Sequence, residues 1–156
     1  MIVDQALSQG RFERDIAPLV REPTIFAGVG LRLLDVTFPV MSAGLWWAAR
    51  GRDIVVRVQA GEYDYLPVQG WWVDDAGAAI QTGVGLVPVG YGFQGNPNPY
   101  AVSKTWFCFP GWREFHDHPS HQNVPWSSIR HDPRYRILGL LAQLQADLNR
   151  SGVQAQ

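Results

Sequence analysis

The sequence predicts an α+β protein with an amino-terminal helix, an antiparallel four-stranded meander, a long loop and a carboxy-terminal helix. Two changes in hydrophobic period carry this prediction. Apolar residues recur at helical spacing up to Val20, at a spacing of two from Gly30 to Val73, and again at helical spacing after Asp132. A helix followed by an antiparallel meander favours a helix packed on one face of the sheet.

The first 20 residues are expected to form one or two short helices. Their apolar residues lie at mostly helical spacing. Gly10 is expected to weaken the helix, and Pro18 and Pro23 are expected to mark the end of the helical region. A first strand is expected from Gly30, where the period changes to two, until Pro39 ends it.

Three further strands complete the expected meander. The second is expected around Leu45–Ala49 and the fourth over Val68–Val73. The third begins at Asp53 and has three aliphatic residues on one face: Ile54, Val56 and Val58. Adjacent residues of a strand point to opposite faces, so one member of each tryptophan pair is expected to be exposed: Trp46 or Trp47, and Trp71 or Trp72.

The rest of the chain is expected to contain a loop and one clear helix. Gly83–Pro99 is rich in glycine and proline and predicts a long irregular loop, which is a common place for function. Asp132 is a candidate N-cap with Pro133 at the first helical position, and the apolar face that follows ends near Asn149. We expect a single domain over residues 1–152 and a frayed tail over residues 153–156.

Length and charge limit the classes of function. The chain of 156 residues has the size of one domain, and its net charge of −1 provides no basic field for nucleic acid or an anionic membrane. The first ten residues lack the basic flank and apolar run of a signal peptide. The longest apolar stretch, Ala43–Ala49, is far shorter than the roughly 20 residues that span a bilayer. A cytoplasmic protein is the default expectation.

The only cysteine, Cys108, is either a reactive thiol or a small buried hydrophobic residue. It follows the short apolar piece Thr105–Phe109 and lies near the glycine-rich loop. A thiol nucleophile needs an exposed sulfur and a donor for the oxyanion that forms when it is acylated. Asn96 and Asn98 lie close upstream and offer amide N–H groups for that role.

Three of the four histidines follow the cysteine and permit two other interpretations. His116, His118 and His121 superficially resemble the metal motif of the metallo-β-lactamases, although Ser120 stands where that motif has an aspartate. Alternatively, one of the three serves as the base of a Cys–His thiol hydrolase with Cys108. A solvated polar loop with locally bonded histidines is the simplest interpretation.

The order of these features resembles the ubiquitin-conjugating (UBC) enzyme fold, in a short bacterial version. Tyr65-Leu66-Pro67 is similar to the family's Tyr-Pro segment, and Asn96-Pro97-Asn98 is similar to its His-Pro-Asn motif, with Cys108 twelve residues after Asn96. Trp126-Ser127-Ser128 resembles the Trp-Ser-Pro segment that precedes the long helix. The chain departs from the family in having Asn96 in place of the histidine, and in the histidine-rich stretch between Cys108 and Trp126.

The resemblance implies a UBC-like domain with a specific mechanism. An activating enzyme passes the carboxy terminus of a ubiquitin-like protein to Cys108 as a thioester, and an amine of a protein target then attacks it. Asn98 would donate to the oxyanion, while Asp117, Glu114 and the nearby histidines are candidates for the base. No cofactor is expected on this chain, because the activating enzyme uses the ATP. The alternative is a binding module, either a catalytically inactive UBC-like protein or a histidine-rich metal-binding protein.

Overall fold

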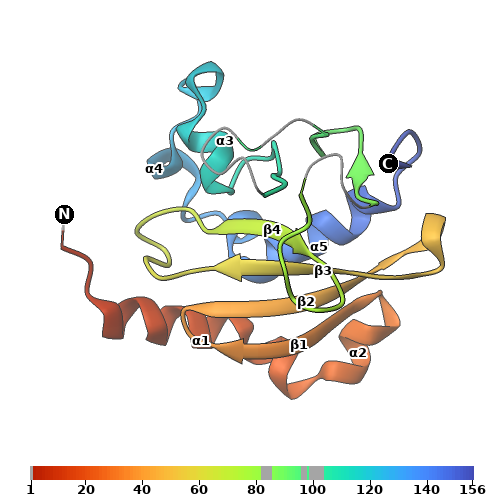
Figure 1. Cartoon of the computed structure of the whole chain (residues 1–156). Coiled ribbons are helices and arrows are strands. Elements are labelled where there is room, and N and C mark those ends of the chain that lie inside the picture. The colour runs from red at the N-terminus through yellow and green to blue at the C-terminus, as the bar shows by residue number, and fades with distance from the viewer. Residues whose placement is uncertain (1, 82–85, 96–97, 99–103) are drawn as a thin grey trace.

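The computed structural model describes residues 2–81, 86–95, 98 and 104–156. Its main sheet is an antiparallel meander in the order β1-β2-β3-β4 (Figure 1). A small second sheet pairs β5 with β6. The strands are β1 (Leu31–Thr37), β2 (Val40–Trp47), β3 (Arg52–Gln59), β4 (Gln69–Val73), β5 (Pro88–Val89) and β6 (Gln154–Ala155). An amino-terminal helix, a four-stranded antiparallel sheet and a carboxy-terminal helix confirm the predicted α+β class.

Two longer helices and several short ones surround the sheet. They are α1 (Gln5–Arg21), α2 (Pro23–Gly28), α3 (Arg113–Asp117), α4 (Trp126–Ile129) and α5 (Ile137–Leu148), with 3-10 turns η1 (Ala48–Arg50), η2 (Pro119–His121) and η3 (Pro133–Tyr135). The side chain of Asp4 caps α1 by accepting from the backbone N–H groups of Ala6 and Leu7. Gly10 does not interrupt α1, because the helix buries Phe12, Ile16 and Leu19 on one side.

The core lies between the sheet and the helices α1 and α5. The predicted face of β3, with Ile54, Val56 and Val58, is buried there. The pairing of β2 with β3 places alternate residues of β2 on the same face: Met41, Ala43, Leu45 and Trp47. The helix α5 contributes Ile137, Leu140, Leu141, Leu144 and Leu148 to this core. One tryptophan of each pair is buried, since Trp47 and Trp72 are 2% and 1% exposed. The expected exposed partner is found in the first pair, where Trp46 is 42% exposed, whereas Trp71 of the second pair is half-buried.

A polar cluster fixes the start of α5 against α1. The hydroxyl of Tyr63 accepts from the backbone N–H of Ile137 at 3.1 Å and donates to Asp15 on α1 at 2.8 Å. Arg136 pairs with both Asp15 and Asp64. Burial and the neighbouring Asp15 carboxylate raise the pKa of Tyr63, so its proton stays in place at neutral pH.

The structure corrects three local expectations. The tail does not fray, because Gln154 and Ala155 pair with Val89 and Pro88. Asp132 caps η3 rather than the long helix, which begins at Ile137. The second strand begins at Val40 and ends at Trp47, earlier than expected. Among the described residues, no helix is long and apolar enough to cross a membrane.

Candidate functional site

The candidate site lies where residues 105–109 pass over the edge of the sheet. The backbone N–H of Cys108 donates to the carbonyl of Gly92 at 2.9 Å, and Phe93 pairs with Phe107. Phe107 is fully buried and packs at 4.9 Å, centroid to centroid, from Trp72 of β4, whereas Cys108 is only half-buried.

Two aromatic residues depend on a glycine in β4. A Cβ atom at Gly70 would collide with the indole of Trp112 and would lie 3.0 Å from the ring of Phe107. These two rings pack at 4.9 Å from each other over the space that Gly70 leaves. The glycine therefore lets the chain on both sides of Cys108 lie directly on the sheet.

The structure brings Cys108 together with one histidine. The Sγ atom of Cys108 lies 3.3 Å from Nε2 of His121, which is within hydrogen-bonding distance for sulfur. The imidazole of His121 stacks on Phe115 with centroids 4.0 Å apart and an angle of 14° between the planes. This stacking fixes the ring so that Nε2 faces the thiol. Burial raises the pKa of Cys108, so the free thiol is protonated at neutral pH.

The other two histidines have different partners. His116 uses both ring nitrogens, since its Nε2 accepts from the N–H of Gly111 at 2.9 Å and its Nδ1 bonds the carbonyl of Val124 at 2.9 Å. An Nε2 that accepts is unprotonated, so Nδ1 carries the proton of the neutral ring. Burial lowers the pKa of His116 and keeps it in that neutral form. His116 therefore has no nitrogen left to serve as a base or as a metal ligand.

His118 has contacts at one of its two ring nitrogens. Its Nδ1 contacts the backbone N–H of Ser120 at 3.2 Å and the Ser120 hydroxyl at 2.6 Å. Its ring stacks on Trp106, and its centroid is 5.5 Å from that of His121. Among the described residues, no group of three His, Cys, Asp or Glu side chains is arranged to hold a metal ion. The three histidines that superficially resemble a metal motif, His116, His118 and His121, therefore do not form a metal site among the described residues.

Asn98, the predicted oxyanion donor, lies in a buried position. It is 2% exposed, and its amide nitrogen lies 3.5 Å from both the carbonyl of Thr105 and Oε1 of Glu114. Thr105 in turn accepts from the backbone N–H of Trp72. An incoming carbonyl would have to reach this amide below the surface, so the role of Asn98 in catalysis stays a prediction. Asn96 and Pro97 lie outside the described residues.

Glu114 is the carboxylic acid near the site whose pKa is shifted most. It is 5% exposed, and its Oε2 has no hydrogen-bond partner among the described atoms. Burial raises the pKa of this carboxyl to about 7, against the smaller opposing effect of the Asn98 hydrogen bond. At neutral pH a large share of the Glu114 side chains is therefore protonated. Glu114 can thus give or take a proton in the physiological range.

Two of the segments that carry the family resemblance meet in space. The indole N–H of Trp126, at the start of α4, donates to the carbonyl of Tyr65 at 3.2 Å. The ring of Trp126 also meets His116 edge-on. The segment between Cys108 and Trp126, which exceeds the family spacing, forms α3 and η2 and supplies both His121 and the Phe115 ring behind it. Sequence reasoning offered three histidines and could not choose among them, because the choice depends on how this segment folds back.

Fold and site together define an α+β protein with a half-buried cysteine–histidine pair at the edge of an antiparallel sheet. Comparison with protein-family models and with curated proteins finds no match to this chain.

Proposed function

We propose that Cys108 is a thiol nucleophile that carries an acyl group as a thioester, and that His121 is the base that activates it. The observation that carries the proposal is the 3.3 Å contact between Sγ and Nε2. Because the pKa of Cys108 is raised, the thiol needs a neighbouring base to take its proton. The His121 ring is already held by stacking on Phe115, so it loses little conformational freedom when it accepts the proton. The resemblance to UBC enzymes supports a ubiquitin-like protein as the acyl donor.

The proposed reaction has two steps. In the first, the Cys108 proton passes to Nε2 of His121, and the sulfur attacks the thioester that links the modifier to the activating enzyme. The new carbon–sulfur bond replaces the old one, and the activating enzyme leaves as a thiolate. In the second, a neutral amine of the protein target attacks the Cys108 thioester and forms an amide, and its nitrogen releases one proton to solvent water. The Cys108 sulfur then leaves and regains its proton from His121.

The test is a thioester assay on a non-reducing gel. The protein is incubated with a cognate activating enzyme and ubiquitin-like protein, together with ATP. We expect a thiol-sensitive adduct that Cys108→Ser abolishes and His121→Gln slows, whereas His131→Gln, an exposed histidine outside the site, leaves it unchanged. No adduct with the wild-type protein would refute the proposal.

A further inference from the structure

A shallow groove of about 310 Å³ lies between α1 and the edge strand β1. One side of α1 forms one wall, and Val36 and Phe38 form the other. The strand β1 is the first strand of the main sheet and pairs only with β2 among the described residues, so its outer edge is open (Figure 1). The groove therefore lies where the sheet has no further strand to cover it.

Apolar residues of the core face remain exposed in this groove. Val36 pairs with Met41, whose side chain is fully buried, so both side chains point to the face of the sheet that α1 and α5 cover. Even so, Val36 is 37% exposed, and Val20 on α1 is 52% exposed. Exposed apolar surface beside an open sheet edge is typical of a protein–protein contact.

The charged residues on this side of α1 complement a second copy of the same surface. Glu13, Ala17 and Arg21 all line the groove and are four residues apart, so they form one row along the helix. The side chains of Glu13 and Arg21 are exposed, and neither forms an ion pair with a described residue. Glu13 only accepts a hydrogen bond from Gln9 at 2.7 Å. Both charges are therefore available to a partner.

The spacing of this row selects one arrangement of two copies. Ala17 lies midway between Glu13 and Arg21, so a twofold axis at Ala17 with antiparallel helices places Glu13 of each copy against Arg21 of the other. A parallel arrangement would instead place glutamate against glutamate and arginine against arginine. The small Ala17 side chains at the axis allow the two helices to approach closely.

We propose that this groove is the interface of a symmetric dimer, in which α1 lies antiparallel to α1 of a second copy with Ala17 at the twofold axis. The second copy covers Val20 and Val36, and two Glu13–Arg21 ion pairs form on either side of the axis. Apolar burial supplies the affinity, while the ion pairs determine the orientation. The proposal does not depend on Cys108 or on the function proposed for it.

The test is sedimentation equilibrium of the full chain at concentrations from about 1 μM to about 1 mM. We expect the wild type to show a reversible equilibrium between monomer and dimer. Glu13→Arg would place two arginines together at both ends of the row, and Arg21→Glu would place two glutamates together. Each substitution should therefore weaken self-association by about tenfold or more.

Two further samples restore the complementary charges. An equimolar mixture of Glu13→Arg and Arg21→Glu brings only opposite charges together across the interface, so we expect a mixed dimer that is tighter than the self-association of either variant. The double variant with both substitutions exchanges the two charges, and it should dimerise about as the wild type does. Recovery in these samples also shows that the single variants are folded.

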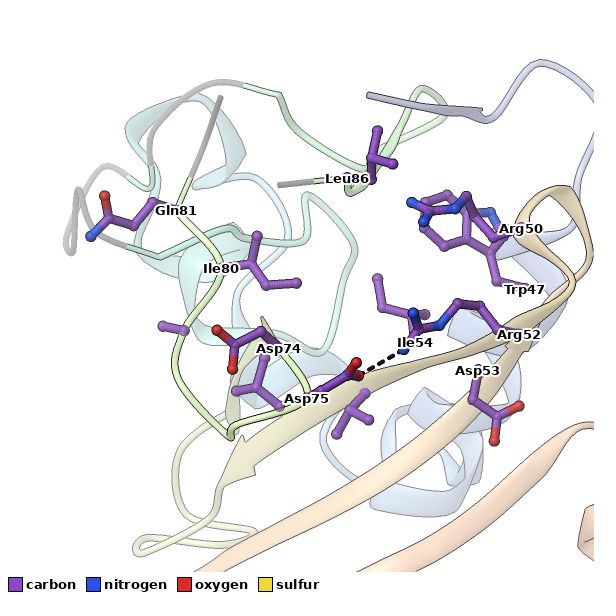
Figure 2. Close-up of a pocket in the computed structure, with 13 residues that line it drawn as sticks. Trp47, Arg50, Arg52, Asp53, Ile54, Asp74, Asp75, Ile80, Gln81 and Leu86 are labelled. Carbon is purple, nitrogen blue, oxygen red and sulfur yellow. Dashed lines mark hydrogen bonds and ion pairs between the residues drawn. The ribbon is translucent and has the colours of Figure 1, made fainter. Parts of the chain in front are cut away.

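Asp75→Arg is the matched control, because it changes the net charge by the same amount as Glu13→Arg. Asp75 follows β4 at the opposite edge of the sheet, where it pairs with Arg52 at 2.7 Å beside a different pocket, as Figure 2 shows. This variant should dimerise as the wild type does. A monomeric wild type at about 1 mM, undiminished dimerisation of Glu13→Arg, or a mixture that associates no better than its components would overturn the proposal.

Discussion

Glu114 gives the sharpest test of the electrostatics at the candidate site. Its carboxyl is 5% exposed, one oxygen has a long contact with the Asn98 amide, and the other has no partner among the described atoms. Burial raises its pKa from the ordinary 4.5 to about 7. The folded state therefore holds the proton up to a higher pH than the unfolded chain does. Between pH 4.5 and about pH 7 the free energy of unfolding therefore falls as the pH rises.

The size of this effect follows from the two pKa values. A rise from 4.5 to about 7 corresponds to about 3 kcal/mol of unfolding free energy, at about 1.36 kcal/mol per pH unit. This stabilisation is fully present below pH 4.5 and is lost as the pH rises through 7. Glu114→Gln removes the titration and keeps the shape of the side chain. Any fixed cost of burying the amide is the same at every pH.

The assay is urea unfolding of the wild type and Glu114→Gln at pH 5 and at pH 8. The advantage of the variant over the wild type should grow by about 2.5 kcal/mol between the two pH values, since most of the titration falls in this window. Glu13→Gln, an exposed glutamate on α1, should show no such change. If the difference between Glu114→Gln and the wild type is the same at both pH values, the carboxyl is not desolvated and the reasoning fails.

Three further predictions test the site and the core. His121→Gln should slow alkylation of Cys108 by iodoacetamide at pH 7 by about tenfold or more, because the proton acceptor is lost; an unchanged rate contradicts the pair. Gly111→Ala should cost about 1–3 kcal/mol in urea unfolding, because φ is +99° and the new Cβ lies 2.5 Å from Leu140 Cδ2; a neutral effect would contradict this geometry. Leu144→Ala should cost about 2–5 kcal/mol, measured in the same way, because Leu144 is fully buried.

The sequence predicted the parts of the fold where a regular period is present. The alternation in β3 and the apolar face of α5 are long enough to show which side is buried. The second strand was misplaced because its first half contains Ser42, Ala43 and Gly44, small residues whose pattern carries no polar alternation. The tail was predicted to fray, and its pairing could not be foreseen, because the strand that pairs with Gln154–Ala155 is Pro88–Val89, which is far away in the sequence.

The start of α5 shows a second limit of sequence reasoning. Asp132 and Pro133 have the residue types of a helix start, but the turn they begin is the 3-10 turn η3. A Cβ at Gly139 would lie 2.5 Å from the carbonyl oxygen of Pro133 and 2.6 Å from that of Arg134. The helix therefore approaches the preceding turn closely, and this contact depends on tertiary packing that a local capping pattern does not record.

The three histidines of one short segment have different roles because their backbone positions differ. His116 is on α3, and the glycine it bonds, Gly111, has a positive φ, so its ring joins two turns. His121 ends η2, stacks its ring on Phe115 and contacts the Cys108 sulfur with Nε2. Loss of thioester formation in a His116 variant would therefore report on folding, since both of its nitrogens are committed to the backbone. Loss in a correctly folded His121 variant would report on proton transfer. Substitution of each histidine, with the free energy of unfolding measured alongside, thus separates the scaffold of the site from its chemistry.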